Sequence, residues 1–190
     1  KAEDYYLKAI GIREDLVKTN PDRFNPDLAT SYNNAGNFYS DQGDPKKAEE
    51  YYLKTIEIYE ALVENNSERF NPDLATSYNN AGVFYSNQDE PSKAEDYYLK
   101  AIGIREDLVK INPERFNPDL AMSYGNAGGF YDVQGELEKA EDYYLKAIGI
   151  YEDLVKNNPK RFNPDLAASY NNAGIFYSNQ DEPSKAEDYY

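Results

Sequence analysis

Apolar residues recur at helical spacing in two consecutive segments of the chain. In the segment 70–88 they fall at i, i+4, i+7, i+8 and i+11, which forms one stripe along a helix. These positions are Leu74, Tyr78, Ala81, Gly82 and Tyr85. The segment that follows has the same kind of spacing at Ala94, Tyr98, Ala101, Ile102, Leu108 and Val109. The pattern predicts two amphipathic helices, called the first-type and the second-type helix below.

Both helices carry boundary signals. Asn71 is expected to cap the first-type helix, Pro72 suits a first turn because its missing N–H is not needed there, and Asp73 faces the positive end of the dipole. The second-type helix is expected to start near Pro91 or Ser92 and to end where asparagine and proline break the pattern at 112–113. The small residues Ala81 and Gly82 predict a close approach of the two helices.

The helix pair is repeated along the chain. The phrase KAEDYY or KAEEYY begins every 46 residues, at Lys1, Lys47, Lys93, Lys139 and Lys185. Periods of roughly 20 to 50 residues indicate solenoids, in which each unit packs on its neighbours. We expect a second-type helix and loop at 1–24, units at 25–70, 71–116 and 117–162, and a truncated unit at 163–190. This gives nine helical segments, the last of them, from Ser184, too short to be stable alone.

A second, longer period is also present. The phrase GIREDLVK occurs at Gly11 and again at Gly103, 92 residues later, so the array resembles a duplicated pair of units. Arg13 and Arg105 alternate with Tyr59 and Tyr151, which predicts a two-unit rhythm on the surface. Because Lys1 falls inside a unit, we expect the chain to be part of a longer array.

Composition excludes several classes of function. The 190 residues include 35 Asp and Glu against 20 Lys and Arg, and this net charge of −15 repels nucleic acid and anionic membranes. No apolar run reaches the roughly 18 residues that span a bilayer, and no signal peptide opens the chain, so a cytoplasmic location is the default expectation. Cysteine and histidine are absent, which removes disulfides, thiolate or imidazole metal sites and His-assisted nucleophiles. We expect no catalytic activity, no metal and no cofactor.

The unit resembles the tetratricopeptide repeat. That family's pattern, W-x2-L-G-x2-Y followed by A-x3-F and a later Ala, is matched with Tyr for Trp and Ala for Leu. The long second-type helix and the Asn-Asn pair of the first are most similar to the kinesin-light-chain-like subgroup, although the unit of 46 residues is longer than usual. The resemblance implies an all-α, right-handed superhelical solenoid of antiparallel helix pairs. The matching residues in one unit are Tyr78, Ala81, Gly82, Tyr85, Ala94, Tyr98 and Ala101.

The resemblance also implies that the first-type helices line a concave groove that holds an extended or helical peptide. Asparagine in a helix interior costs about 0.5 kcal/mol relative to alanine, so a repeated pair needs an explanation. Two remain open: the amides bind the backbone of a peptide, or they form a ladder between neighbouring first-type helices or a solvated face. The predicted groove residues are Asn33, Asn34, Asn37, Asn79, Asn80, Val83, Asn126, Asn171 and Asn172.

One unit departs from the others on this face. Gly125 and Gly129 stand where the preceding unit has Asn79 and Val83, and Met122 and Val133 flank them. Glycine in a helix costs roughly 1 kcal/mol relative to alanine, and two of them open a shallow apolar depression. One hypothesis is a pocket for a bulky side chain of the ligand, and the alternative is drift in one repeat.

The remaining charged residues suggest no catalytic or anion-binding site. The predicted first-type helices carry no cation, which argues against a clamp for a peptide's terminal carboxylate. Arg23, Arg69, Arg115 and Arg161 fall in predicted loops, where we expect pairing with Asp or Glu. The sequence therefore predicts a protein or peptide interaction scaffold. The alternative is a structural spacer or self-assembly module that stacks head to tail, because KAEDYY occurs at both ends.

Overall fold

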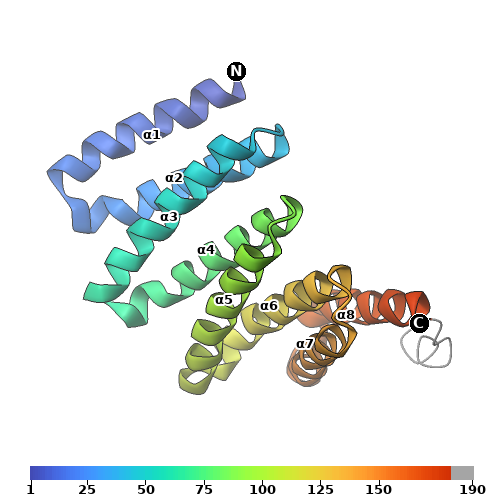
Figure 1. The fold of residues 1–190 in the computed structure, drawn as a ribbon. Coiled ribbons are helices and arrows are strands. Elements are labelled where there is room, and N and C mark those ends of the chain that lie inside the picture. The colour runs from blue at the N-terminus through green and yellow to red at the C-terminus, as the bar shows by residue number, and fades with distance from the viewer. Residues whose placement is uncertain (181–190) are drawn as a thin grey trace. The chain divides into compact units, whose positions relative to one another are not determined.

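The computed structural model describes residues 1–180, and this part of the chain contains eight α-helices (Figure 1). The first-type helices are α2 (Pro21–Asp41), α4 (Ser67–Asn87), α6 (Pro113–Val133) and α8 (Pro159–Asn179). The second-type helices are α1 (Ala2–Thr19), α3 (Pro45–Asn65), α5 (Pro91–Ile111) and α7 (Leu137–Asn157). The ninth segment predicted from Ser184 lies outside the described residues.

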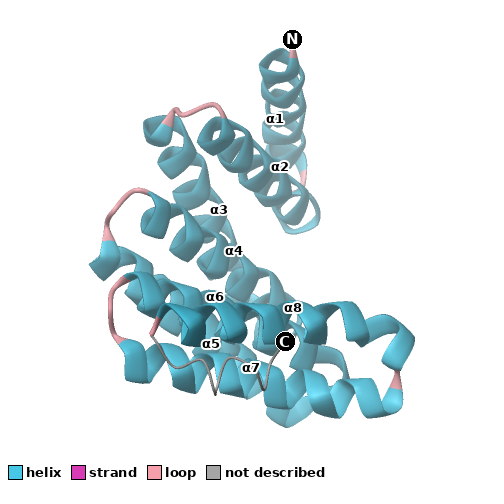
Figure 2. Ribbon diagram, turned by 90° about the vertical axis from the view of Figure 1, so that its right-hand side faces the viewer, coloured by secondary structure: helices cyan, strands magenta, loops and turns pink. Residues whose placement is uncertain are grey.

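Consecutive helices pack on one another within each of two compact units, Lys1–Ala101 and Ile102–Tyr190. In the first unit α2 packs against both α1 and α3, and α3 packs against α4. In the second unit α7 packs against α6 and α8, and α6 also contacts α8. Short loops join the helices (Figure 2). The all-α class and the sequential pairing of helices are therefore as predicted.

The first-type helices begin one turn earlier than the sequence pattern predicts. The cap of α4 is Asn66, whose side-chain oxygen accepts a hydrogen bond from the backbone N–H of Arg69 at 3.1 Å. Asn71 and Pro72, predicted at the helix start, lie inside the helix. The proline removes one i→i−4 hydrogen bond, but the earlier start places buried Phe70 on the helix. The other first-type helices begin in the same way, capped by Asn20, Asn112 and Asn158.

The arginines expected in loops therefore lie in the first turns of these helices. The guanidinium of Arg69 lies over the ring of Phe70, 4.8 Å from its centroid, and Arg115 lies over Phe116 at the same distance. Such cation–π contacts contribute about 0.5–1 kcal/mol at exposed sites. They replace the predicted pairing with Asp or Glu, which was wrong.

Glycine and tyrosine set the spacing between the two helix types. A Cβ atom built on Gly82 would lie 2.8 Å from Cδ1 of Tyr98, and one built on Gly128 would lie 2.8 Å from Cδ1 of Tyr144. Carbon atoms in contact are normally about 3.5–4.0 Å apart, so any larger residue would collide with the ring. The predicted close approach at the small residues is confirmed.

Tyrosine hydroxyls of the first-type helices bond to carboxylates of the preceding second-type helices. Tyr78 donates to Oε1 of Glu60 at 2.5 Å, and Tyr124 donates to Oε1 of Glu106 at 2.7 Å. Burial, and next the bond to Glu60, raise the pKa of Tyr78. These glutamates are acceptors in the packing of helix pairs, which accounts for their recurrence.

A second cluster, in the first compact unit, links α4 and α5 to the preceding helix α3. The hydroxyl of Tyr85 donates to Oε1 of Glu49 at 2.8 Å, and its ring stacks on that of Tyr97 at a centroid distance of 5.4 Å. The ammonium of Lys93 lies 4.6 Å from the Tyr85 ring centroid and 3.2 Å from Glu49. The bond to Tyr85 is the main cause of a lowered pKa at Glu49. The repeated phrase KAEDYY is thus a packing motif.

The alternation of arginine and tyrosine is a core feature, and the predicted surface rhythm was wrong. Arg105 is 2% exposed, and its Nη1 donates to the backbone carbonyl of Asp119 at 2.8 Å and to Oγ of Ser123 at 2.5 Å. Burial lowers the pKa of Arg105. Tyr151, the equivalent residue one unit later, is also buried and donates to the carbonyl of Pro118 at 3.4 Å. In the second unit of the fold, α6 therefore receives an arginine from the helix before it and a tyrosine from the helix after it.

Candidate functional site

The candidate site in each compact unit is the face of its first-type helices opposite the apolar stripe, called the outer face below. In the first unit it consists of Thr30, Asn33, Asn34 and Asn37 of α2 and Thr76, Asn79, Asn80 and Val83 of α4. In the second unit it consists of Met122, Gly125, Asn126, Gly129 and Val133 of α6 and Asn171, Asn172 and Ile175 of α8.

The asparagines of the outer face differ in exposure. Asn79 is only 4% exposed, which the sequence pattern did not indicate. Helical periodicity reports the direction of a residue within its own helix, whereas burial also depends on the neighbouring helices. Asn34, Asn37, Asn171 and Asn172 are exposed, and Asn33, Asn80 and Asn126 are half-buried.

One amide–amide hydrogen bond joins two outer-face helices of the first unit. Nδ2 of Asn80 in α4 donates to Oδ1 of Asn33 in α2 at 2.9 Å. A carboxamide has two N–H donors and an oxygen with two lone pairs, so this bond uses only part of either amide. The ladder expected as one explanation of the asparagines is present at this pair, and peptide binding by the amides stays a prediction.

Asn37 has a different partner. Its Oδ1 accepts a hydrogen bond at 2.7 Å from the hydroxyl of Tyr52 in α3. Tyr52 is buried, and that burial is the main reason why its pKa is raised to about 12. Asn37 therefore supplies an acceptor to a hydroxyl that has little access to water.

The outer face of α6 contains open space where the other helices have side chains. A Cβ built on Gly125 would meet no atom within 4 Å, and one on Gly129 would meet only the Tyr144 hydroxyl, at 3.6 Å. Met122 and Val133 are 43% and 79% exposed. Their spacing from the glycines along α6 places all four residues on one side of this helix, and the pocket hypothesis stays a prediction.

Two polar groups that the sequence did not single out lie beside the glycines. Tyr144 is 7% exposed, and its hydroxyl makes no hydrogen bond within residues 1–180. The carboxylate of Asp132, one turn after Gly129, is half-buried and forms no hydrogen bond or ion pair with any described residue. Burial raises the pKa of Asp132.

Only one of these two groups could have been found from the sequence. Asp132 replaces the serine found at Ser40 and Ser86, a difference visible when the units are aligned. Tyr144 corresponds to Tyr52 and Tyr98 in other units, so an alignment of the units does not single it out. Where Asn37 accepts the hydrogen bond of Tyr52, the helix that faces Tyr144 has Gly129.

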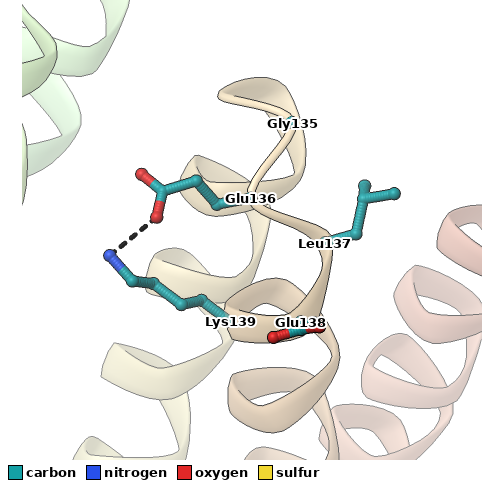
Figure 3. A pocket seen from close by; sticks show the side chains of 5 residues that line it. All are labelled: Gly135, Glu136, Leu137, Glu138 and Lys139. Atoms are coloured by element: carbon teal, nitrogen blue, oxygen red, sulfur yellow. Dashed lines mark ion pairs between the residues drawn. The ribbon is translucent and has the colours of Figure 1, made fainter.

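Two further hollows lie in the described units. One, of about 150 Å³, lies among α2, α3 and α4 and is lined by Thr30, Asn33, Tyr59, Asp73, Thr76 and Ser77. The other, of about 480 Å³, borders the turn between α6 and α7 (Figure 3). There Glu136 and Lys139 form an ion pair at 2.7 Å, and Leu137 points away from them.

Groups suited to a metal ion and membrane-spanning helices are both absent from the described residues. No set of three or more His, Cys, Asp or Glu side chains in that part of the chain is placed to hold a metal ion. None of its helices is long and apolar enough to cross a bilayer.

Sequence profiles of the tetratricopeptide repeat match residues 27–107 and residues 120–160. Together the two matches cover more than half of the chain, and they include α3, α4 and α7 and most of α2, α5 and α6. No curated protein sequence matches the chain.

Solved structures with a similar fold cover nearly the whole chain at low identity. A kinesin-light-chain candidate of Podosopora anserina with nearly identical TPR-like repeats is 16% identical, with a TM-score of 0.67 over 99% of this chain and 85% of that one. BtubC (BKLC) from P. vanneervenii is 19% identical, with a TM-score of 0.58 over 98% of this chain and 85% of its own. PilF of Pseudomonas aeruginosa is 21% identical, with a TM-score of 0.57 over 86% of this chain and 59% of its own.

Proposed function

The chain belongs to the tetratricopeptide repeat family, and from this premise we propose that it is an interaction scaffold whose outer face binds an extended or helical peptide. We also propose that it is a member of the kinesin-light-chain-like subgroup, because it has a long second-type helix and Asn-Asn pairs in its first-type helices. The similarity in fold to the repeats of Podosopora anserina supports that placement.

The observation that carries the proposal is the hydrogen bond between Asn80 and Asn33. It fixes the orientation of two half-buried amides and leaves N–H groups of Asn33 and the oxygen of Asn80 for other partners. A peptide backbone offers both carbonyl acceptors and N–H donors, which match such a pair. Amides held in place before binding lose less side-chain entropy when the peptide arrives.

The absence of Lys and Arg from the outer face, as defined by its residues above, also fits recognition of a backbone. Neutral amides hydrogen-bond a main chain of any sequence, whereas a cluster of like charges would select particular side chains. Exposed Asn34 extends the pair along α2, and buried Asn79 is left out of the proposed contact surface.

The test uses a peptide selected on this chain from a random display library. Changing Asn33 and Asn80 together to alanine should weaken its binding by about tenfold or more, because two or more hydrogen bonds are lost. The control variant carries Glu57→Ala and Glu64→Ala on the exposed surface of α3, and it should bind as the unchanged chain does. Equal affinity of both variants, with helix content unchanged, would exclude the amides as the binding surface.

A second candidate function is assembly of copies head to tail. Residues 1–18 are identical to residues 93–110, and Tyr5 and Ile12 on α1 are 64% and 63% exposed. In this arrangement α1 of one copy would pack on α8 of another as a second-type helix packs on a first-type helix. Sedimentation velocity over a hundredfold range of concentration tests it, since a constant monomer would exclude assembly.

A further inference from the structure

In two of the helix pairs, the hydroxyl of the second-type tyrosine lies next to the residue fifteen positions earlier in the facing first-type helix. That residue is Asn37 for Tyr52 and Gly129 for Tyr144. Asn37 accepts the hydrogen bond of Tyr52 at 2.7 Å. Gly129 has no side chain to offer such an acceptor, and the Tyr144 hydroxyl makes no hydrogen bond within residues 1–180.

The Tyr144 hydroxyl is reachable from outside although the residue is 93% buried. Among the described residues, every fully buried side-chain oxygen or nitrogen has a hydrogen-bond partner. The Tyr144 hydroxyl has no hydrogen-bond partner in this part of the chain, so it is exposed to solvent. The space that a Cβ of Gly129 would fill lies 3.6 Å from this oxygen, which makes the gap above Gly129 the way in.

A negative charge stands at the same gap. Asp132 follows Gly129 by three residues and so lies on the same side of α6. It is close enough to Tyr144 for its charge to act on the phenol. The nearest lysine along the chain, Lys139, pairs with Glu136 at 2.7 Å. Asp132 itself forms no ion pair within the described residues.

From this geometry we propose that the gap above Gly129 is a subsite for a lysine or arginine side chain of a peptide bound along α6. The cationic N–H groups bond to the carboxylate of Asp132 and to the oxygen of Tyr144. The methylene stem crosses the space at Gly125 and Gly129. The inference rests on the proposed peptide-binding function and names the side chain that the third unit selects.

Other side chains fit the gap less well. A hydrocarbon would cover Asp132 and the Tyr144 hydroxyl without giving either a partner, which is unfavourable for any polar group. A carboxylate would face Asp132 and a chain of net charge −15. A carboxamide supplies hydrogen bonds but leaves the charge uncompensated, whereas an ammonium or guanidinium group supplies both. Long cationic side chains also place their stems against apolar surface, here between Met122 and Val133.

The experiment compares three blocked pentapeptides, Ac-Gly-Gly-X-Gly-Gly-NH2, with X as lysine, arginine or norleucine. Norleucine keeps the length of lysine and removes its charge. Binding to the isotopically labelled full chain is followed through the amide signals of Gly125, Gly129 and Asp132. The lysine and arginine peptides should shift these signals at concentrations about tenfold lower than the norleucine peptide.

Four variants locate the effect. Asp132→Ser, which installs the residue of the sibling units, should remove most of the preference for lysine over norleucine, and Tyr144→Phe should reduce it about threefold. Gly129→Val, which copies Val83, should abolish binding at the gap. Asp41→Ser removes one exposed carboxylate elsewhere and should change nothing.

The possible outcomes distinguish a failure of this subsite from a failure of the proposed binding by Asn33 and Asn80. Equal binding of the lysine and norleucine peptides, or no shift at the three amides with any peptide, overturns the subsite. A library-selected peptide that depends on Asn33 and Asn80 but binds Asp132→Ser unchanged also overturns it, and the proposed function stands. If the variant with Asn33 and Asn80 changed to alanine binds the library-selected peptide normally, and the lysine peptide is still preferred over the norleucine peptide, the subsite is supported and the proposed amide surface is not.

Discussion

Replacing Gly128 and Gly125 by alanine, one at a time, separates packing from helix propensity within a single helix. Both residues are interior positions of α6, so each substitution gains the same propensity, about 1 kcal/mol. The new methyl group differs in its surroundings. On Gly128 it would lie 2.8, 3.0 and 3.1 Å from three atoms of the buried Tyr144 ring, and on Gly125 it would meet nothing within 4 Å.

The magnitude follows from the overlap. To restore a normal carbon contact, the Tyr144 ring must retreat by about 0.7 Å or more. The same ring also contacts the ring of Phe176, with centroids 5.6 Å apart. Overpacking of this kind costs about 1–3 kcal/mol. Because the propensity gain cancels between the two variants, Gly128→Ala should be less stable than Gly125→Ala by about that amount.

Urea unfolding followed by far-UV circular dichroism measures the difference in stability. The midpoints of two variants are compared only if their transitions have the same slope, because a repeat array need not unfold in one step. Gly125→Ala should be more stable than the unchanged chain. If the two variants unfold at the same urea concentration, the account of glycine as a requirement of helix spacing is refuted.

Three further predictions concern the hydrogen bonds and the titration of the core. Tyr124→Phe removes the 2.7 Å bond to Glu106 and should cost about 0.5–1.5 kcal/mol in urea unfolding, and no loss would show that the bond is immaterial. Arg105→Ala should lower the free energy of unfolding by roughly 2–4 kcal/mol, because packing and two hydrogen bonds are lost. Arg105→Tyr, which copies the neighbouring units, should lower it by less than half as much. Equal losses in both variants would contradict the interchange of the two residues. Burial raises the pKa of several tyrosines to about 12, so above about pH 10 the unfolded chain binds fewer protons than the folded one and stability should fall between about pH 10 and 12. Circular dichroism and phenolate absorbance recorded together check this, and tyrosines that all titrate near pH 10 in an intact fold would contradict it. The tyrosines concerned are Tyr52, Tyr98, Tyr144 and Tyr151.

The helices and their order were predictable because the apolar stripe and the 46-residue period are properties of the sequence alone. The small pair at Ala81 and Gly82 also predicted the close helix contact correctly. The helix starts were not predictable in this way. Each unit offers two asparagines able to cap, and the start at Asn66 brings Phe70, which is buried in the fold, onto the helix.

Burial of polar residues was the other feature beyond the reach of the sequence. Arg105 reads as a surface residue because charged side chains are seldom fully buried. Its burial depends on the carbonyl of Asp119 and the hydroxyl of Ser123, which come from another helix. The unusual glycines of α6 were visible as departures from the repeat. That the Tyr144 hydroxyl lies next to Gly129 could be seen only in the structure.

Hydrogen exchange of the full chain, with and without a library-selected peptide, tests the central claim that the outer face of the first-type helices is the binding surface. In the peptide complex, exchange should be slower within segments 30–37 of α2 and 76–83 of α4, which carry the joined amides of Asn33 and Asn80. The second-type helices should exchange as they do in the free chain. Protection confined to α3, α5 and α7, with the outer face unchanged, would contradict this claim.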